Sequence, residues 1–295
     1  MKNIRRTFLK NTIAGAMSIP FLSQTSLAKA HTQIRTSTEK PKSKSNIPDK
    51  VTSITKSDLD FSLDCYSFDN FVVGECNSMA HAAATTVASL PVQSYNPLYI
   101  HGGVGVGKTH LLHAIANQLQ ANDSTKNIVL ISSEYFMTMF VDSIRNSTAN
   151  KFKEQFRSVD ILLVDDIQFF AGKTGTQVEF FHTFNALYGA NKQIILTSDT
   201  LPSDIEFLEE RLQSRFAQGL VVKLNQPDLE TRVAILRQKA KVDEVDINED
   251  AANYLANKIQ GNARELEGAL HQFMFLARLK NVPISMELIR YSGLL

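Results

Sequence analysis

Cysteine is scarce in this sequence, since Cys65 and Cys76 are the only two among 295 residues. Two thiols cannot build the disulfide framework that stabilises small secreted domains, and this usage is typical of a reducing compartment. The pair could form a bridge if the chain were exported. We interpret both as structural or incidental thiols.

Long apolar runs are missing as well. The mildly apolar stretch at residues 12–22 is short and contains Gly, Ser and Pro. A membrane-spanning helix needs about 20 consecutive apolar residues. We therefore expect no integral membrane domain.

Several signatures of catalysis and metal binding are lacking. The sequence has no serine-hydrolase elbow and no Cys–His signature. His101, His110, His113 and His182 have no carboxylate or Cys partners at the spacing of metal ligands. We interpret His110 and His113 as packing or polar-face residues of a helix.

Positive charge is concentrated at the start of the chain. Residues 1–57 hold eleven of the 31 Lys and Arg residues but only two of the 30 Asp and Glu residues. The remainder has 20 basic and 28 acidic residues, a formal net charge of −8, although the whole chain carries +1. Non-specific duplex DNA binding needs many Lys and Arg residues. Any DNA contact by the later part must therefore be local and geometric.

The first 30 residues resemble a twin-arginine export signal. Arg5 and Arg6 precede Phe-Leu-Lys, and the small residues Ala28 and Ala30 suit a signal peptidase. The alternative is a short basic arm that is amphipathic or unstructured. Residues 31–58 are rich in Ser, Thr, Lys and Pro without an apolar period, which predicts a disordered basic linker.

A phosphate-binding loop stands at residues 102–109, with the sequence GGVGVGKT. A short apolar β run (97–100) precedes it and helical apolar spacing (111–119) follows. Its glycines, which let backbone N–H groups wrap phosphates, are Gly102, Gly103, Gly105 and Gly107. Lys108 would reach the β- and γ-phosphates, and the Thr109 hydroxyl would ligate magnesium at a helix N-terminus. The motif predicts binding of ATP or ADP with Mg²⁺.

Carboxylates follow two further apolar strands. The run 161–164 ends at Asp165 and Asp166, and a third buried strand, 193–198, ends at Asp199. The carboxyl ends of parallel strands meet at one ligand-binding edge. We expect Asp165 to hold magnesium, Asp166 to orient the attacking water and Asp199 to sense the γ-phosphate. The alternatives are a helix N-cap for Asp165 or Asp166 and a turn for Asp199.

Three arginines are candidates for contacts with a nucleotide, either that of a neighbouring subunit or that of the chain itself. Arg211 and Arg215 are four residues apart on one helical face. An isolated helix would leave them in solvent, whereas in a multimeric ATPase such a face supplies an arginine finger to the neighbour's nucleotide. Arg264, in the C-terminal helical part, could fold back onto the phosphates or form a surface pair with Glu267.

An aromatic stripe is most simply interpreted as core. Its members are Phe169, Phe170, Phe180, Phe181 and Phe184.

Together these segments resemble the ATPase core of the DnaA family of bacterial replication initiators, which are AAA+ proteins. The resemblance covers about residues 63–295. Stretches that are distinctive beyond a generic P-loop are SFDNFV (67–72), VDDIQFF (164–170), FFHTFN (180–185), RLQSRF (211–216) and RELEG (264–268).

The resemblance implies a fold and a mode of action. A P-loop AAA+ αβα sandwich with a parallel sheet would span residues 59–225, and a small all-α lid of three helices would span residues 226–295. The helices of residues 134–156 resemble the family's initiator-specific insert, which steers assembly. In the family, ATP-bound subunits stack into a helical filament on origin DNA and help to melt it.

The resemblance also assigns roles to residues. The segment 68–72, with Asn70 and Phe71, would line the adenine site. Arg215 would act in trans, and Arg264 would report ATP from the lid.

Departures from the family concern DNA. The chain stops at Leu295, where the lid would end, so we expect the helix-turn-helix reader of duplex DNA to be absent. We also expect the helicase-recruiting N-terminal domain to be absent, with the leader and linker in its place. Val141 and Lys173 of the single-strand-binding surface are kept, but Gly175 stands where relatives carry Arg. Loss of that cation would weaken single-strand binding.

We therefore expect an ATP-binding, slowly hydrolysing AAA+ switch that self-associates through the Arg215 face. Its DNA binding would be weak or dependent on a partner, and its role would lie in chromosomal replication initiation or its regulation. One alternative is a regulatory module acting on a full-length initiator; another is an exported or fusion-derived remnant. We expect a cytoplasmic location, because little ATP is available outside, with export as the alternative.

Overall fold

The computed structural model describes residues 66–91 and 95–293. The predicted leader, the linker and the expected start of the folded domain at residue 59 lie outside the described residues. Cys76 is an unpaired thiol.

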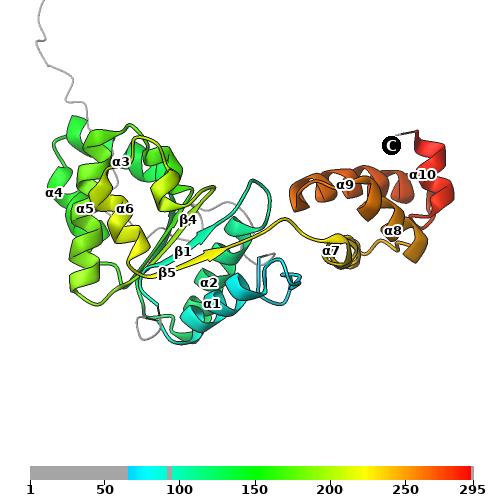
Figure 1. The fold of residues 1–295 in the computed structure, drawn as a ribbon, viewed down its shortest axis with the longest axis horizontal. Helices are drawn as coiled ribbons and strands as arrows, with labels where there is room; N and C mark the ends of the chain where they lie inside the picture. The colour runs from blue at the N-terminus through cyan, green and yellow to red at the C-terminus, as the bar shows by residue number, and fades with distance from the viewer. Residues whose placement is uncertain (1–65, 92–94, 294–295) are drawn as a thin grey trace, which may run out of the picture. The chain divides into compact units, whose positions relative to one another are not determined.

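A five-stranded parallel sheet in the order β2-β3-β4-β1-β5 forms the centre of the predicted nucleotide-binding domain. Figure 1 labels its strands β4, β1 and β5. The strands are β1 (Leu98–His101), β2 (Ile128–Ser132), β3 (Ile161–Asp165), β4 (Gln193–Ser198) and β5 (Leu220–Lys223). The order places β4 between β3 and β1. The ends of the three strands that precede Asp166, Asp199 and the P-loop are thus neighbours, as the sequence predicts.

Helices cover both faces of the sheet, which explains why its strands are nearly continuous apolar runs (Figure 1). On one face pack α1 (Ser78–Ser89) and α2 (Lys108–Asn122). On the other pack α3 (Ser133–Arg145), α4 (Ala149–Arg157), α5 (Thr174–Gly189) and α6 (Glu210–Ala217). Leu98 and Ile100 contribute to the first core and Tyr99 to the second, following the two-residue period of a strand. The predicted αβα sandwich is confirmed.

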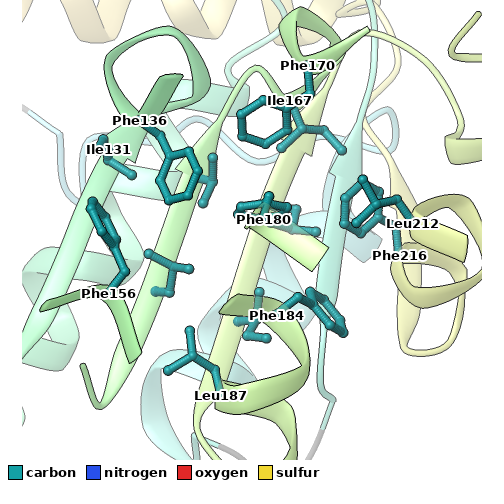
Figure 2. Close-up of a cluster of buried hydrophobic side chains, with 14 of the residues drawn as sticks. Ile131, Phe136, Phe156, Ile167, Phe170, Phe180, Phe184, Leu187, Leu212 and Phe216 are labelled. Atoms are coloured by element: carbon teal, nitrogen blue, oxygen red, sulfur yellow. The ribbon is translucent and has the colours of Figure 1, made fainter. Parts of the chain in front are cut away.

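Phenylalanines dominate the core on the α3–α6 face (Figure 2). Phe136 of α3 lies 5.4 Å from Phe180 and 4.8 Å from Phe156, measured between ring centroids, with edge-on geometry. Edge-on aromatic pairs add to the stabilisation that burial provides. The core thereby joins the two helices of residues 133–157 firmly to α5.

The prediction that the whole aromatic stripe is core is wrong for Phe169. Phe170, Phe180 and Phe184 are fully buried and Phe181 packs against them, but Phe169 is 46% exposed. Phe169 and Phe170 lie in the 3₁₀ helix η2 (Ile167–Phe170), where consecutive side chains point about 120° apart. Phe170 thus faces the core, and Phe169 lines the cavity described below.

Replacing Phe136 with alanine is expected to lower the free energy of unfolding by about 3–5 kcal/mol, because it opens a cavity among aromatic rings. Denaturant titration of the full chain measures this change. Tyr135, its neighbour on α3, is 52% exposed, so Tyr135→Ala is the matched control and should cost less than about 1 kcal/mol. Equal effects of the two changes would contradict the packing described here.

A small helical domain follows the sheet, with its own apolar core. Its helices are α7 (Leu229–Val242), α8 (Glu249–Lys258), α9 (Ala263–Lys280) and α10 (Met286–Ser292). The family resemblance implied three helices, and α10 is a fourth. Ser285 caps α10, and Leu288 and Ile289 bury their side chains in the core of this helical domain. The helix α10 is therefore part of the domain. Within residues 66–91 and 95–293, no helix is both long and apolar enough to cross a membrane.

Candidate nucleotide site

A cavity of about 340 Å³ lies beside the carboxyl ends of β1, β3 and β4. Segments spread between Tyr66 and Glu267 line it. The predicted site residues among them are Asn70, Phe71, Gly105, Gly107, Lys108, Thr109, Asp166, Asp199 and Arg264. The structure thus brings most of the predicted nucleotide-binding residues to one cavity.

The P-loop runs from the end of β1 into α2. Gly105 and Gly107 have positive φ angles of 71° and 105°, a backbone conformation that favours glycine. A Cβ at Gly105 would also lie 2.4 Å from the side-chain oxygen of Asn262. Gly107 is the N-cap of α2, so the loop delivers a helix N-terminus to the cavity.

Lys108 is buried and makes three polar contacts. Its Nζ donates to the carbonyl oxygens of Gly102 (2.8 Å) and Gly103 (2.9 Å) and forms an ion pair with Asp199 Oδ1 (2.6 Å). Gly102 and Gly103, also predicted to contact phosphates, are not among the cavity-lining residues; their carbonyl oxygens contact Lys108. A Cβ at Gly102 would approach the carbonyl oxygen of Leu224 to 2.3 Å, so close backbone packing requires glycine there.

Asp165 lies at the centre of a group of oxygen atoms. Its Oδ2 accepts from the Thr109 hydroxyl (2.8 Å), and its Oδ1 accepts from the Thr197 hydroxyl. The described part of the chain holds no cluster of three or more His, Cys, Asp or Glu side chains suited to a metal ion. Carboxylate and hydroxyl oxygens fit Mg²⁺, which is commonly held by one or two carboxylates together with phosphates and water. The residues present therefore fit a magnesium ion that arrives with a nucleotide.

Asp166 and Asp199 are joined by Gln168. Gln168 Nε2 donates to Asp166 Oδ1 and to Asp199 Oδ2, both at 3.1 Å. Asp166 has a left-handed backbone (φ 57°). Burial, together with the nearby charge of Asp165, raises the pKa of the Asp166 carboxyl. Its side chain makes no N-cap hydrogen bond to η2, so the alternative of a simple helix cap is not supported.

Two of these polar residues were missed at the sequence level. Gln168 and Thr197 hold the carboxylates in place through hydrogen bonds. Neither residue is part of the P-loop, and neither is a carboxylate at the end of a strand. A polar Thr within the apolar run of β4 was the available signal, because a buried hydroxyl needs a partner. The Thr197 Oγ1 also accepts a hydrogen bond from the backbone N–H of Asp166 (3.0 Å).

Aromatic rings and histidines form the wall next to the P-loop helix. The Phe71 ring is stacked with that of His81 (centroids 5.8 Å apart) and lies edge-on to that of His110 (5.2 Å). His110 Nε2 is 2.9 Å from the carbonyl oxygen of Ser67. His113 is buried, and its Nδ1 has no hydrogen-bond partner in the described structure. The Tyr66 ring lies 5.3 Å from that of His113, between centroids. These contacts agree with the interpretation of both histidines as packing residues, and His110 also lines the cavity.

Stability is expected to fall as the pH drops below about 6.5. Burial lowers the pKa of His113, so the unfolded chain binds its proton at a higher pH than the folded chain does. Below pH 6.5 the unfolded state therefore holds more protons than the folded state. The free energy of unfolding then falls by at most about 1.4 kcal/mol per pH unit for one such histidine. Urea titrations at pH 7.5 and 5.5 should show a smaller difference for His113→Gln than for the unmodified chain. His271 is exposed, so His271→Gln is the control; an unchanged pH difference in His113→Gln would refute the assignment.

The lid contributes the remaining wall. Arg264 lines the cavity, and the neighbouring Ala263 N–H donates to the Gly105 carbonyl (3.0 Å). Glu267 pairs with Lys239 (2.9 Å). Among ion pairs of the described residues, none joins Glu267 to Arg264, so that alternative is not supported. Lys239 and Glu267 also line the cavity and were not predicted.

Residues expected to contact other molecules lie outside the cavity lining. Arg211 on α6 lies over the Phe181 ring (4.5 Å) and pairs with Glu209. Arg215 Nη1 donates to Gln218 Oε1 (3.0 Å). Val141 is 37% exposed, and Lys173, also exposed, is the N-cap residue of α5.

Comparison with known proteins gives consistent matches. Residues 63–223 match the family described as the bacterial DnaA ATPase domain. The chromosomal replication initiator protein DnaA of Magnetococcus marinus is 56% identical over 227 residues, 77% of this chain and 51% of that protein. The chain thus spans about half the length of the curated relatives that it matches.

Solved structures agree. Domain III of the Thermotoga maritima replication initiation protein DnaA is 42% identical, with a TM-score of 0.73, covering 76% of this chain and 93% of that one. A replication initiator DnaA bound to AMPPCP and single-stranded DNA is 36% identical, with a TM-score of 0.68, covering 77% and 68%.

Proposed function

The chain belongs to the bacterial DnaA ATPase domain family, and from this premise we propose that it is an ATP-binding AAA+ switch of the replication-initiator type. The observation that carries the proposal is the convergence of Lys108, Thr109, Asp166 and Asp199 on one cavity, with Asp165 bonded to Thr109. The 36% identical DnaA structure bound to AMPPCP supports a nucleotide as the ligand.

The phosphates would be held by the P-loop and by Lys108. The Lys108 ammonium is the cation of the P-loop itself, and it already contacts the two glycine carbonyls and Asp199. Binding the β- and γ-phosphates would exchange some of these contacts for charge-assisted hydrogen bonds. Asp199 would then be placed to report whether a γ-phosphate is present.

Magnesium would be held by Thr109 and Asp165, and it would supply neutralisation of phosphate charge. Asp166 would accept a hydrogen bond from the water that attacks the γ-phosphorus, while the bond from that phosphorus to the β–γ bridging oxygen breaks. The raised pKa of Asp166 suits a carboxylate that accepts a proton. Hydrolysis slow enough to maintain the ATP form would make the site a switch.

Assembly and DNA binding would use the exposed surfaces. Arg215 would reach the nucleotide of a second copy, and Arg264 would couple lid position to the bound nucleotide. Single-stranded DNA would contact Val141 and Lys173, weakly because Gly175 supplies no cation. A full-length initiator would be a further protein partner of this chain.

We also propose that the protein acts in the cytoplasm, because the site requires ATP. Fractionation of cells that express the chain from its own start tests this. A processed product beginning near residue 31 outside the cytoplasm would overturn it.

Calorimetric titration of the full chain with ATP and with ADP tests the proposed ligand. We expect saturable binding of one nucleotide per chain, and tighter ATP binding with Mg²⁺ than with EDTA. Absence of binding by chain that circular dichroism shows to be folded would refute the function.

A further inference from the structure

Gln177 of α5 is a buried glutamine whose side chain bonds only to backbone groups of two distant segments. It is 1% exposed. Its Nε2 donates to the carbonyl oxygens of Phe170 (2.8 Å) and Phe207 (2.9 Å). Its Oε1 accepts from the backbone N–H of Glu209 (2.9 Å). Both ends of the amide are therefore fixed.

The joined segments belong to two different parts of the proposed machinery. Phe170 ends η2, the turn that begins after Asp166 and carries Gln168, which contacts Asp166 and Asp199. Glu209 is the N-cap residue of α6, the helix that carries Arg215. A single side chain thus connects the segment beside the chain's own nucleotide cavity to the helix proposed to act on a neighbour.

The loop that leads into α6 depends on these hydrogen bonds. Phe207 has a φ of 58°, which is uncommon for a bulky side chain, and it is 81% exposed. Packing of its ring therefore does not hold this conformation. Its carbonyl oxygen accepts hydrogen bonds from Gln177 and from the backbone N–H of Gly172 (3.2 Å). These bonds hold the loop from which α6 starts, and Leu212 and Phe216 anchor the helix itself in the core.

We propose that Gln177 is a positioning residue for the trans-acting arginine, an inference that rests on the proposed function of Arg215. Two carbonyl oxygens require donors and one N–H requires an acceptor, and within this space a primary amide satisfies all three. By holding the start of α6 to the end of η2, Gln177 sets where Arg215 lies relative to the subunit's own site. It touches no nucleotide itself.

Gln177→Met tests this role, because methionine matches the length of glutamine but offers no donor. Nucleotide affinity should stay within about twofold of the unmodified chain, since the cavity is intact. ATP hydrolysis by the assembled protein should fall about 10- to 100-fold, as expected for a displaced catalytic group. If this variant does not fold, Gln177→Asn keeps the amide, shortens its reach by one methylene and carries the same expectations.

Mixing variants separates positioning from general damage. Lys108→Ala cannot use its own site but keeps Arg215, so it should restore hydrolysis several-fold when mixed with Gln177→Met. The Arg215→Ala variant lacks the trans-acting arginine and should not restore hydrolysis when mixed with Gln177→Met. Arg215→Ala mixed with Lys108→Ala is the reference pair, and it should recover. If the reference pair does not recover hydrolysis, the trans role of Arg215 is wrong, and the inference about Gln177 is wrong as well.

A matched control uses another buried glutamine. Gln193 is fully buried at the amino end of β4, away from the site, where its Nε2 donates to the Tyr95 carbonyl (2.8 Å). Gln193→Met should lower the melting temperature but leave hydrolysis per folded chain unchanged. Recovery of the reference pair without recovery of Gln177→Met plus Lys108→Ala, or parallel loss of nucleotide binding in Gln177→Met, would overturn the proposal.

Discussion

Replacing Lys108 with alanine is expected to abolish measurable ATP binding. The Lys108 side chain is 6% exposed, and its ammonium is the cation that the P-loop would present to the phosphates. Two or more charge-assisted hydrogen bonds, at about 1.5–3 kcal/mol each, correspond to a loss of roughly 10²- to 10⁴-fold in affinity. Calorimetric titration with ATP and Mg²⁺ measures this loss directly.

The fold should survive this change, because Lys108 lies in the first turn of α2 at the surface of a cavity. Lys126→Ala removes a surface lysine that pairs with Asp123 at 3.9 Å, and it should bind ATP normally. An affinity within about threefold of the unmodified chain for Lys108→Ala would mean that the phosphates bind elsewhere.

Replacing Arg215 with alanine is expected to leave ATP affinity unchanged while it removes ATP-dependent assembly and lowers hydrolysis by about 10³-fold or more. Arg215 does not line the cavity of its own chain, and its guanidinium donates to the nearby Gln218 side chain. Its guanidinium is therefore available to stabilise transition-state charge on a neighbour's nucleotide. Calorimetry and steady-state hydrolysis at high protein concentration measure the two properties separately.

Arg211→Ala is the matched control, since Arg211 shares the helix but is held by Phe181 and Glu209 of its own chain. It should alter hydrolysis much less. Equal losses of ATP binding and assembly in Arg215→Ala would remove the trans assignment and indicate a structural role.

Local patterns predicted the parts of the site that one segment encodes. The P-loop was recognisable because the glycines, Lys108 and Thr109 stand between an apolar strand and a helix. Asp166 and Asp199 were recognisable because each follows a buried strand, and parallel strands end at one edge. The sheet order then made these ends neighbours.

Contacts between distant segments were not predictable in the same way. Lys239 and Glu267 enter the cavity from two lid helices, and their spacing in the sequence carries no signal of that meeting. Phe169 and Phe170 are adjacent apolar residues, and only the 3₁₀ turn separates their directions. Gln177 looks like any polar helix residue until the backbone groups of Phe170, Phe207 and Glu209 surround it.

Light scattering of the purified full chain with ADP or ATP, each with and without single-stranded DNA, tests the central claim most directly. The proposed initiator-type switch predicts growth in mass with ATP but not with ADP, and further growth when DNA is added. A chain that binds ATP yet stays monomeric under all four conditions would contradict the account.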